Sequence, residues 1–161
     1  MITILPLTSI IEKEQTQQAF VSRLVERIEY NINELGAIKK ILFRKTFDAL
    51  KAVRPGYVNH ILMVLTRDYI NEYNDIFENY RNSQSLPADT ITPLDTWLQP
   101  HKEELKHRFW KIADHYAERR KGHALETLYR KFRPTVESHL PTVYRELVHI
   151  ICEFTIQNTQ S

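Results

Sequence analysis

The chain has 161 residues, of which 42% are hydrophobic and 26% charged, and its formal net charge is +2 at pH 7. These values are typical of one globular domain with an ordinary core. Cys152 is the single cysteine, which excludes an internal disulfide, and no apolar run approaches the roughly 18 residues that a membrane helix needs. The first residues lack the basic start and cleavage site of a signal peptide, so we expect a cytoplasmic protein.

Three glycines, Gly36, Gly56 and Gly122, stand where one helix is expected to end and the next to begin. Glycine is common just past a helix C-terminus because it enters the left-handed conformation at little cost. This punctuation predicts an all-α protein, an irregular bundle of five to six helices that forms a single domain over residues 1–161. It also excludes a glycine-rich phosphate loop.

An apolar N-terminal arm, residues 1–8, precedes the first expected helix. Its hydrophobic side chains are Ile2, Ile4, Leu5 and Leu7. The helix begins near Ser9, where Ser9 and Glu12 match a capping box, and continues to about residue 35. Residues 12–18 carry no apolar stripe, so we expect this part to overhang the core or to contact something polar. The arm must pack on its own domain or on a partner. Uncovered apolar surface commonly marks an interface, so we favour a contact of the arm and the overhang with a second copy or another protein.

Two helices follow, over about 37–53 and 57–81, separated by an Arg-Pro-Gly turn. In the first of them the apolar spacing predicts five side chains that face inward. These are Ile38, Ile41, Leu42, Leu50 and Val53. The second is apolar nearly all round at residues 61–65, which is typical of a helix buried on several sides.

The second half of the chain begins with a long loop over residues 82–99, which contains a short helical turn near 93–98. A helix over about 100–121 comes next. Another begins near His123 and is kinked or ended by Pro134, because proline removes a backbone hydrogen bond. The last helix starts near Pro141, and residues 157–161 are expected to fray.

Two Glu-x-x-His motifs are the sharpest candidate for metal chemistry. They comprise Glu104 with His107 and Glu146 with His149. Di-iron bundles use two such motifs together with further glutamates. At about 100° per residue, however, all four side chains point away from the apolar stripes of their helices. We therefore predict no metal site.

His60 lies on the otherwise apolar helix 57–81. A buried histidine there could serve as an axial haem ligand, so a haem or small-ligand sensor with a globin-like helical fold is one alternative. This alternative is a fold-level analogy only, and the leading prediction includes no cofactor.

Basic side chains gather in two parts of the chain, and residues 37–56 carry six of them against one acid. Such clusters can contact phosphates, which makes a nucleic-acid-binding protein the second alternative. The candidates are Lys39, Lys40, Arg44 and Lys45 in the first cluster, and Arg119, Arg120, Lys121, Arg130, Lys131 and Arg133 in the second. Solvated helix faces carry similar charge, and no DNA-binding motif accompanies the clusters.

No arrangement of residues typical of an enzyme can be assigned from spacing alone. The leading hypothesis is a non-catalytic helical regulatory or protein-interaction module, self-associating or partner-binding, with contacts through the N-terminal arm.

Overall fold

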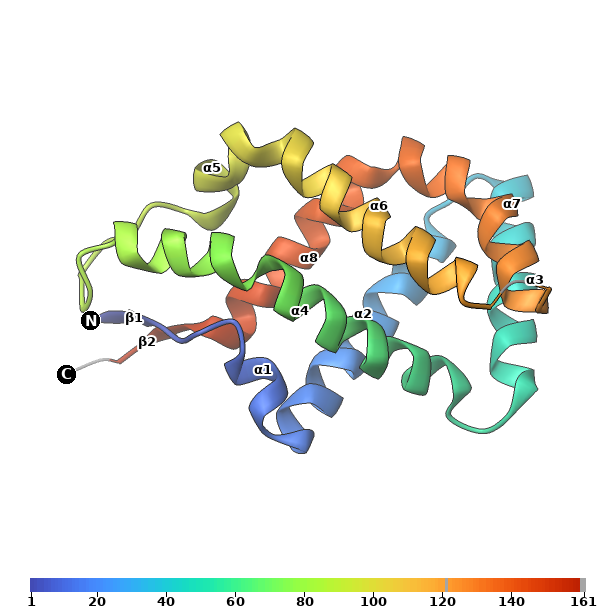
Figure 1. Ribbon diagram of the computed structural model, residues 1–161, viewed down its shortest axis with the longest axis horizontal. Helices are drawn as coiled ribbons and strands as arrows, with labels where there is room; N and C mark the ends of the chain where they lie inside the picture. The colour runs from blue at the N-terminus through green and yellow to red at the C-terminus, as the bar shows by residue number, and fades with distance from the viewer. Residues whose placement is uncertain (121, 160–161) are drawn as a thin grey trace.

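The computed structural model, which describes residues 1–120 and 122–159, is an irregular bundle of α-helices (Figure 1). The elements in chain order are β1 (Ile2–Ile4), α1 (Ser9–Glu12), α2 (Glu14–Asn33), α3 (Ala37–Val53), α4 (Tyr57–Ser83), α5 (Leu94–Leu98), the 3-10 turn η1 (Gln99–His101), α6 (Lys102–Glu118), α7 (Ala124–Ser138), α8 (Leu140–Thr155) and β2 (Ile156–Asn158). Within the described residues six helices have 15 residues or more, while α1 and α5 are single turns. The predicted all-α bundle is confirmed.

Two apolar clusters form the interior, and α4 contributes to both. The larger unites α2, α4 and α8 with the N-terminal segment and α5. Its buried members are Ile4, Leu7, Ile10, Phe20, Ile70, Phe77, Tyr80, Leu94 and Ile150. The smaller lies where α2, α3 and α4 meet and consists of Ile32, Phe47 and Val58. The α3–α7 end is the one far from both chain termini (Figure 1).

The N-terminal arm packs on its own chain, the first of the two possibilities, and not chiefly on a partner as we expected. β1 pairs antiparallel with β2, with Ile4 opposite Ile156. Ile4 is 3% exposed and Leu7 2% exposed, while Ile2 and Leu5 are half-buried. The arm is therefore part of the larger core and leaves little apolar surface for another molecule.

The C-terminal segment is also more ordered than predicted. Gln157 and Asn158 belong to β2, and the amide of Thr159 donates to the carbonyl of Met1 at 2.9 Å. Residues 160 and 161, the rest of the expected frayed tail, lie outside the described residues. Strands of three residues carry too little alternation to be recognised from sequence.

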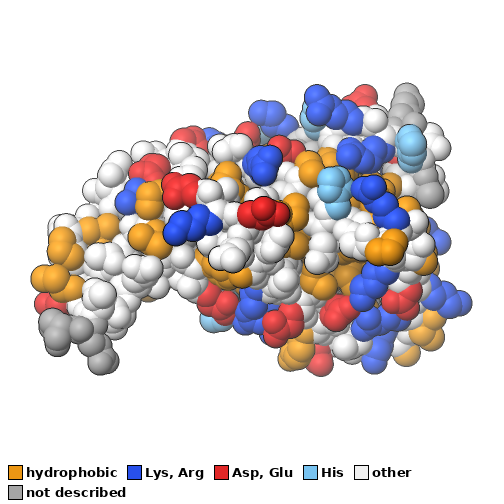
Figure 2. All heavy atoms as spheres, turned by 90° about the horizontal axis from the view of Figure 1, so that it is seen from below, with side chains coloured by type: hydrophobic (Ala, Val, Ile, Leu, Met, Phe, Trp, Pro, Cys, Tyr) orange, Lys and Arg blue, Asp and Glu red, His pale blue; other side chains and the backbone are white. Residues whose placement is uncertain are grey.

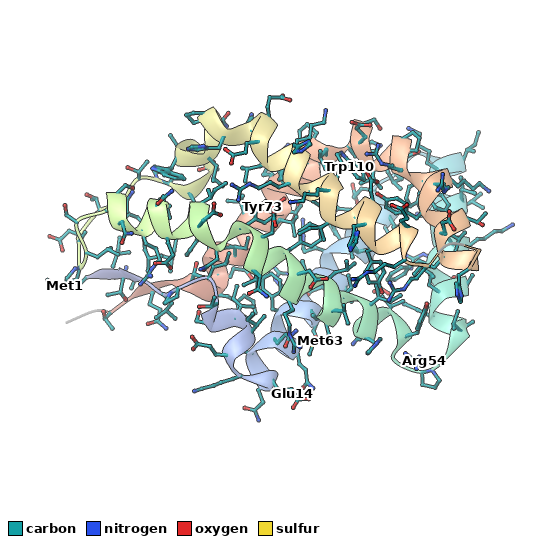
Figure 3. All side chains as sticks on the ribbon, viewed as in Figure 1. Met1, Glu14, Arg54, Met63, Tyr73 and Trp110 are labelled. Atoms are coloured by element: carbon teal, nitrogen blue, oxygen red, sulfur yellow. The ribbon has the colours of Figure 1, made fainter. Side chains whose placement is uncertain are left out.

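The expected first helix is interrupted at Lys13, whose backbone is extended, and no side chain caps α1 or α2. The stretch over residues 12–18 does not overhang the core; a polar contact, the second possibility, anchors it there. Gln17 is 2% exposed, and its Nε2 donates to the backbone carbonyl of Met63 at 2.9 Å. Figure 3 shows Met63 beside the start of α2.

The loop and turns follow the sequence closely. Gly56 and Gly122 have left-handed φ values of 73° and 83°, whereas Gly36 has φ −57°. The loop after α4 contains α5 where a helical turn was predicted, and α7 continues through Pro134 to Ser138. No described helix is long and apolar enough to cross a lipid bilayer.

The arm's burial predicts a large difference between two chemically identical substitutions. Ile4→Ala removes a side chain that is 3% exposed and lowers the free energy of unfolding by about 2–5 kcal/mol. Ile38→Ala, at a side chain that is 85% exposed, changes it by no more than about 0.5 kcal/mol. Urea denaturation of both variants measures the difference. Equal effects would show that the arm is not part of the core.

Candidate interaction site

Helix α3 meets the rest of the chain through its aromatic side. Phe47 is buried in the smaller cluster, and Phe43 and Leu50 pack against that cluster. The ring of Phe43 also lies 4.6 Å from the ring of Phe132 on α7. α3 is thus held between α2 and α4 on one side and α7 on another, with its aromatic residues inward.

The opposite side of α3 exposes a strip of apolar residues. Ile38, Ile41, Leu42 and Val53 are 85%, 58%, 37% and 62% exposed. At about 100° per residue they share a face with three further exposed residues. We call this face the outer face of α3, defined by Ile38, Ile41, Leu42, Lys45, Ala49, Ala52 and Val53. These positions lie roughly opposite Phe47 on the helix.

This arrangement corrects the sequence prediction for α3. Of the five side chains expected inward, only Leu50 packs against a core cluster. The helix has two apolar stripes on opposite sides, and periodicity does not tell which of them meets the chain's own core. The bulky phenylalanines take the inner position because they bury more area per residue.

Lys45 stands in the middle of the outer face, one or two turns from Ile38, Ile41 and Leu42. It forms no ion pair with any described residue, and the same holds for Lys39 at the edge of the face. Asp48 is the single acid of α3. The outer face is therefore an apolar strip with one lysine at its centre, flanked by Asp48 at one edge and by Lys39 beyond the other.

The two basic clusters of the sequence come to the same end of the molecule, because α7 packs on α3. Lysine and arginine side chains gather at the right-hand end of Figure 2, where Figure 1 places α3 and α7. Arg54, at the turn from α3 to α4, lies at this end too (Figure 3). This convergence could not be derived from the sequence, since the clusters are about 80 residues apart.

Several of these cations already have partners. Arg130 pairs with Glu126 at 2.8 Å and Arg133 with Asp114 at 2.8 Å. The guanidinium of Arg120 lies 3.5 Å from the ring centre of Tyr116. Other contacts join Arg44 to Asn33 and Lys51 to Glu29. Arg119 and Lys131 are exposed, and Lys121 falls outside the described residues.

The aromatic residues between these bases are not available for stacking on nucleotides. Phe132 is buried against Phe43, and the hydroxyl of Tyr129 donates to Asp114. Any nucleic-acid contact at this end would rest on charge.

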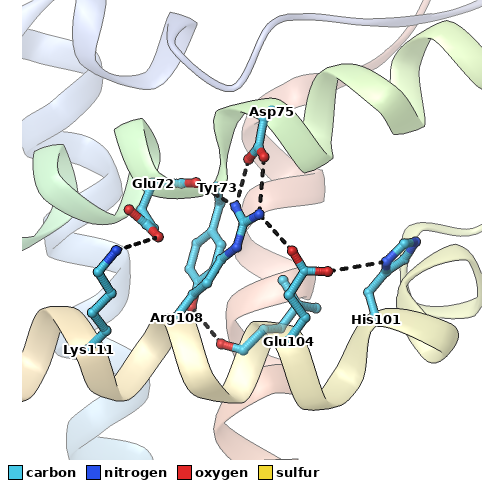
Figure 4. Close-up of polar contacts among 8 residues, drawn as sticks. Glu72, Tyr73, Asp75, His101, Glu104, Arg108 and Lys111 are labelled. Carbon is cyan, nitrogen blue, oxygen red and sulfur yellow. Dashed lines mark hydrogen bonds and ion pairs between the residues drawn. The ribbon is translucent and has the colours of Figure 1, made fainter.

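The first Glu-x-x-His motif belongs to an ion-pair network on the surface, shown in Figure 4. Arg108 donates to Glu104 at 2.7 Å and to Asp75 at 2.8 Å, which joins α6 to α4. His101 lies 3.8 Å from the other oxygen of Glu104. His107 is exposed.

The second motif is also occupied by ion pairs. Arg27 of α2 donates two hydrogen bonds of 2.6 Å to Glu146 of α8. His149 points to the surface and lies 3.1 Å from Glu153. Among the described residues there is no group of three or more His, Cys, Asp or Glu side chains that could hold a metal ion.

His60 does not meet the requirement for a buried haem ligand, because its side chain is exposed on the first turn of α4. Two shallow hollows of about 470 and 600 Å³ lie along α6. The first is lined by Lys106, Asp114 and Arg133, and the second, towards α4, by Asp68 and Arg119 among others. Both mix acids with bases and select no ligand charge.

Comparison with known proteins places the chain in a family without assigning a function. Residues 7–155 match a family described as "Family of unknown function (DUF6918)". The protein belongs to this family. No curated protein matches the chain, and no solved structure does.

The ion pairs between helices predict loss of stability in acid. Hydrogen bonds from Arg27 lower the pKa of Glu146, and bonds from Arg23, Arg108 and Arg133 do the same for Glu153, Asp75 and Asp114. A carboxylate with a lowered folded-state pKa adds stability above its unfolded pKa of about 4. That stability is lost as pH falls through the folded value.

Denaturation at several pH values tests this expectation. The free energy of unfolding decreases steadily as pH falls below about 5. Glu146→Gln lowers stability at pH 7 and makes the decrease shallower, since one proton-linked group is gone. Glu12→Gln, at an exposed carboxylate without an ion pair among the described residues, serves as control. An equally steep decrease in Glu146→Gln would contradict the role of the Arg27 pair.

Proposed function

We propose that this protein is a non-catalytic helical interaction module that binds a partner chain, either a second copy or another protein, through the outer face of α3. One observation supports the proposal most: Ile38, Ile41 and Val53 are each more than half exposed on a single helix face. Contiguous apolar surface of this kind commonly marks an interaction site.

The apolar area that a partner would cover limits the binding free energy that the outer face alone can provide. Fully burying a large aliphatic side chain contributes about 1.5–3 kcal/mol, so covering what is still exposed here contributes on the order of 4–7 kcal/mol. The loss of translational and rotational freedom costs about 4–15 kcal/mol. The apolar strip therefore supports a weak complex, and a stable one also needs contacts with the charged residues around it.

We further propose a regulatory role in the cytoplasm, in which occupancy of this face reports the presence of the partner. A reducing compartment agrees with the half-buried thiol of Cys152, whose pKa is raised to about 11 by burial. The thiol stays protonated and unreactive at neutral pH.

Two charges on the outer face test the proposal. Ile41→Glu with Leu42→Glu removes binding, because carboxylates replace apolar contact area, and leaves the unfolding midpoint within a few degrees of the native value. Native mass spectrometry of protein purified gently from its source then shows the wild type in a complex and the variant as a single chain. Ala19→Glu with Ser22→Glu, at exposed positions of α2, keeps the complex. A wild type that is always a single chain would refute the proposal.

Nucleic-acid binding is a second candidate, because the basic clusters of α3 and α7 share one end of the fold (Figure 2). Lys40 and Lys131 come from different clusters, and both are exposed. If both contact phosphates, they act on one binding surface.

Salt titration distinguishes this candidate from a solvated surface. Binding of a 20-base-pair DNA or RNA duplex weakens steeply with salt, and Lys40→Gln and Lys131→Gln each reduce the slope of log K against log salt by about 1. Lys13→Gln, at an exposed lysine that belongs to neither basic cluster, leaves the slope unchanged. Undetectable binding, or a slope that neither variant changes, eliminates the candidate.

A further inference from the structure

We propose that the outer face of α3 binds an acidic amphipathic α-helix of a different protein. This inference rests on the proposed function and adds the chemistry of the partner to it.

The shape of the surface favours a helix as occupant. From Ile38 to Val53 the strip extends along about 22 Å of helix, at 1.5 Å per residue. Its large side chains cluster at Ile38, Ile41 and Leu42, while Ala49 and Ala52 leave a lower surface beyond them. Ridges spaced three and four residues apart on one helix fit the grooves of another. A partner helix of about four turns would cover the whole strip.

The charge of the surface favours an acidic partner. A docked helix covers Lys45 together with the isoleucines around it, and a buried ammonium without a partner is strongly unfavourable. Lys39, beyond one edge of the face, also forms no ion pair within the described residues, while Asp48 flanks the other edge. A carboxylate opposite Lys45, with another on the side of Lys39, satisfies the covered charge and adds the binding energy that the apolar strip lacks.

The same charges oppose a second copy as the occupant. The midpoint of the strip lies at about Lys45, so a two-fold pair of α3 helices, parallel or antiparallel, brings the two Lys45 side chains together. Asp48 is the single acid that α3 offers in return. Like charges placed together across an interface cost several kcal/mol. A nucleic acid would satisfy the cations but leave the isoleucines uncovered, and an acidic helix accounts for both.

Photo-crosslinking in the source cells tests the inference. The full chain carries p-benzoylphenylalanine in place of Ile41, and mass spectrometry gives the sequence of the crosslinked segment. We expect a segment of another protein with apolar residues three and four apart and several Asp or Glu beside them. The same photoreactive residue in place of Ser22 on α2, which is exposed, gives no such product. A crosslink to a second copy, a nucleic acid, a lipid, or a segment without acids overturns the inference.

The outcomes separate this inference from the proposed function. A second copy as product leaves the interaction module intact and removes only the acidic partner, whereas no product at any outer-face position removes both. The captured segment, synthesised as a peptide, then provides an affinity test. Lys45→Glu weakens its binding about tenfold or more, and Lys13→Glu, which changes the net charge equally, leaves it within about twofold. Equal affinity for the two variants contradicts a carboxylate opposite Lys45.

Discussion

The packing of Phe43 and Phe47 determines how one end of this molecule is built. Phe47 enters the cluster with Ile32 and Val58, which joins α3 to α2 and α4. Phe43 packs against Phe132, with the two rings tilted by 48°, and so brings α7 to the same place. Because these rings take the inner side of α3, its second apolar stripe is turned to solvent and the two basic regions become neighbours. The exposed apolar strip of α3 and the neighbouring basic clusters both follow from the side on which α3 packs.

The other end of the molecule is closed in a different way, by the meeting of the two chain termini. β1 and β2 pair over three residues each, and Ile4 joins the larger core. A loop residue, Ala88, extends the pairing through Ile2. The arm that looked most like an interface in the sequence is thereby used internally. The exposed apolar surface that remains is concentrated instead on α3, where no segment of the described chain covers it.

Features set by residues close together in the sequence could be predicted, whereas contacts between distant segments could not. Helix bounds followed from local signals, such as Gly56 in a left-handed turn and the loop before α6. The outward direction of Glu104, His107 and His149 also followed, because a helix fixes the angle between neighbours, whereas Glu146 faces Arg27 of α2. The face by which α3 packs did not, since Ile38 and Phe47 are equally apolar and lie on opposite sides. The pairing of Ile4 with Ile156 was out of reach for a similar reason: two short segments about 150 residues apart carry no shared local pattern.

Ion pairs join the long helices, but none among the described residues involves Lys45 on the outer face of α3. The chain has 20 acids for 22 lysines and arginines, so carboxylates are not scarce. Several of them join the long helices: Arg27 bonds Glu146, Arg23 bonds Glu153 and Arg108 bonds Asp75. Lys45 forms no ion pair with a described residue, although Asp48 lies one turn away on the same helix. Exposed pairs contribute little to stability, so the folded chain gains little from neutralising Lys45 itself. A lysine kept without a carboxylate in the centre of an apolar strip is suited to a charge that arrives with another molecule.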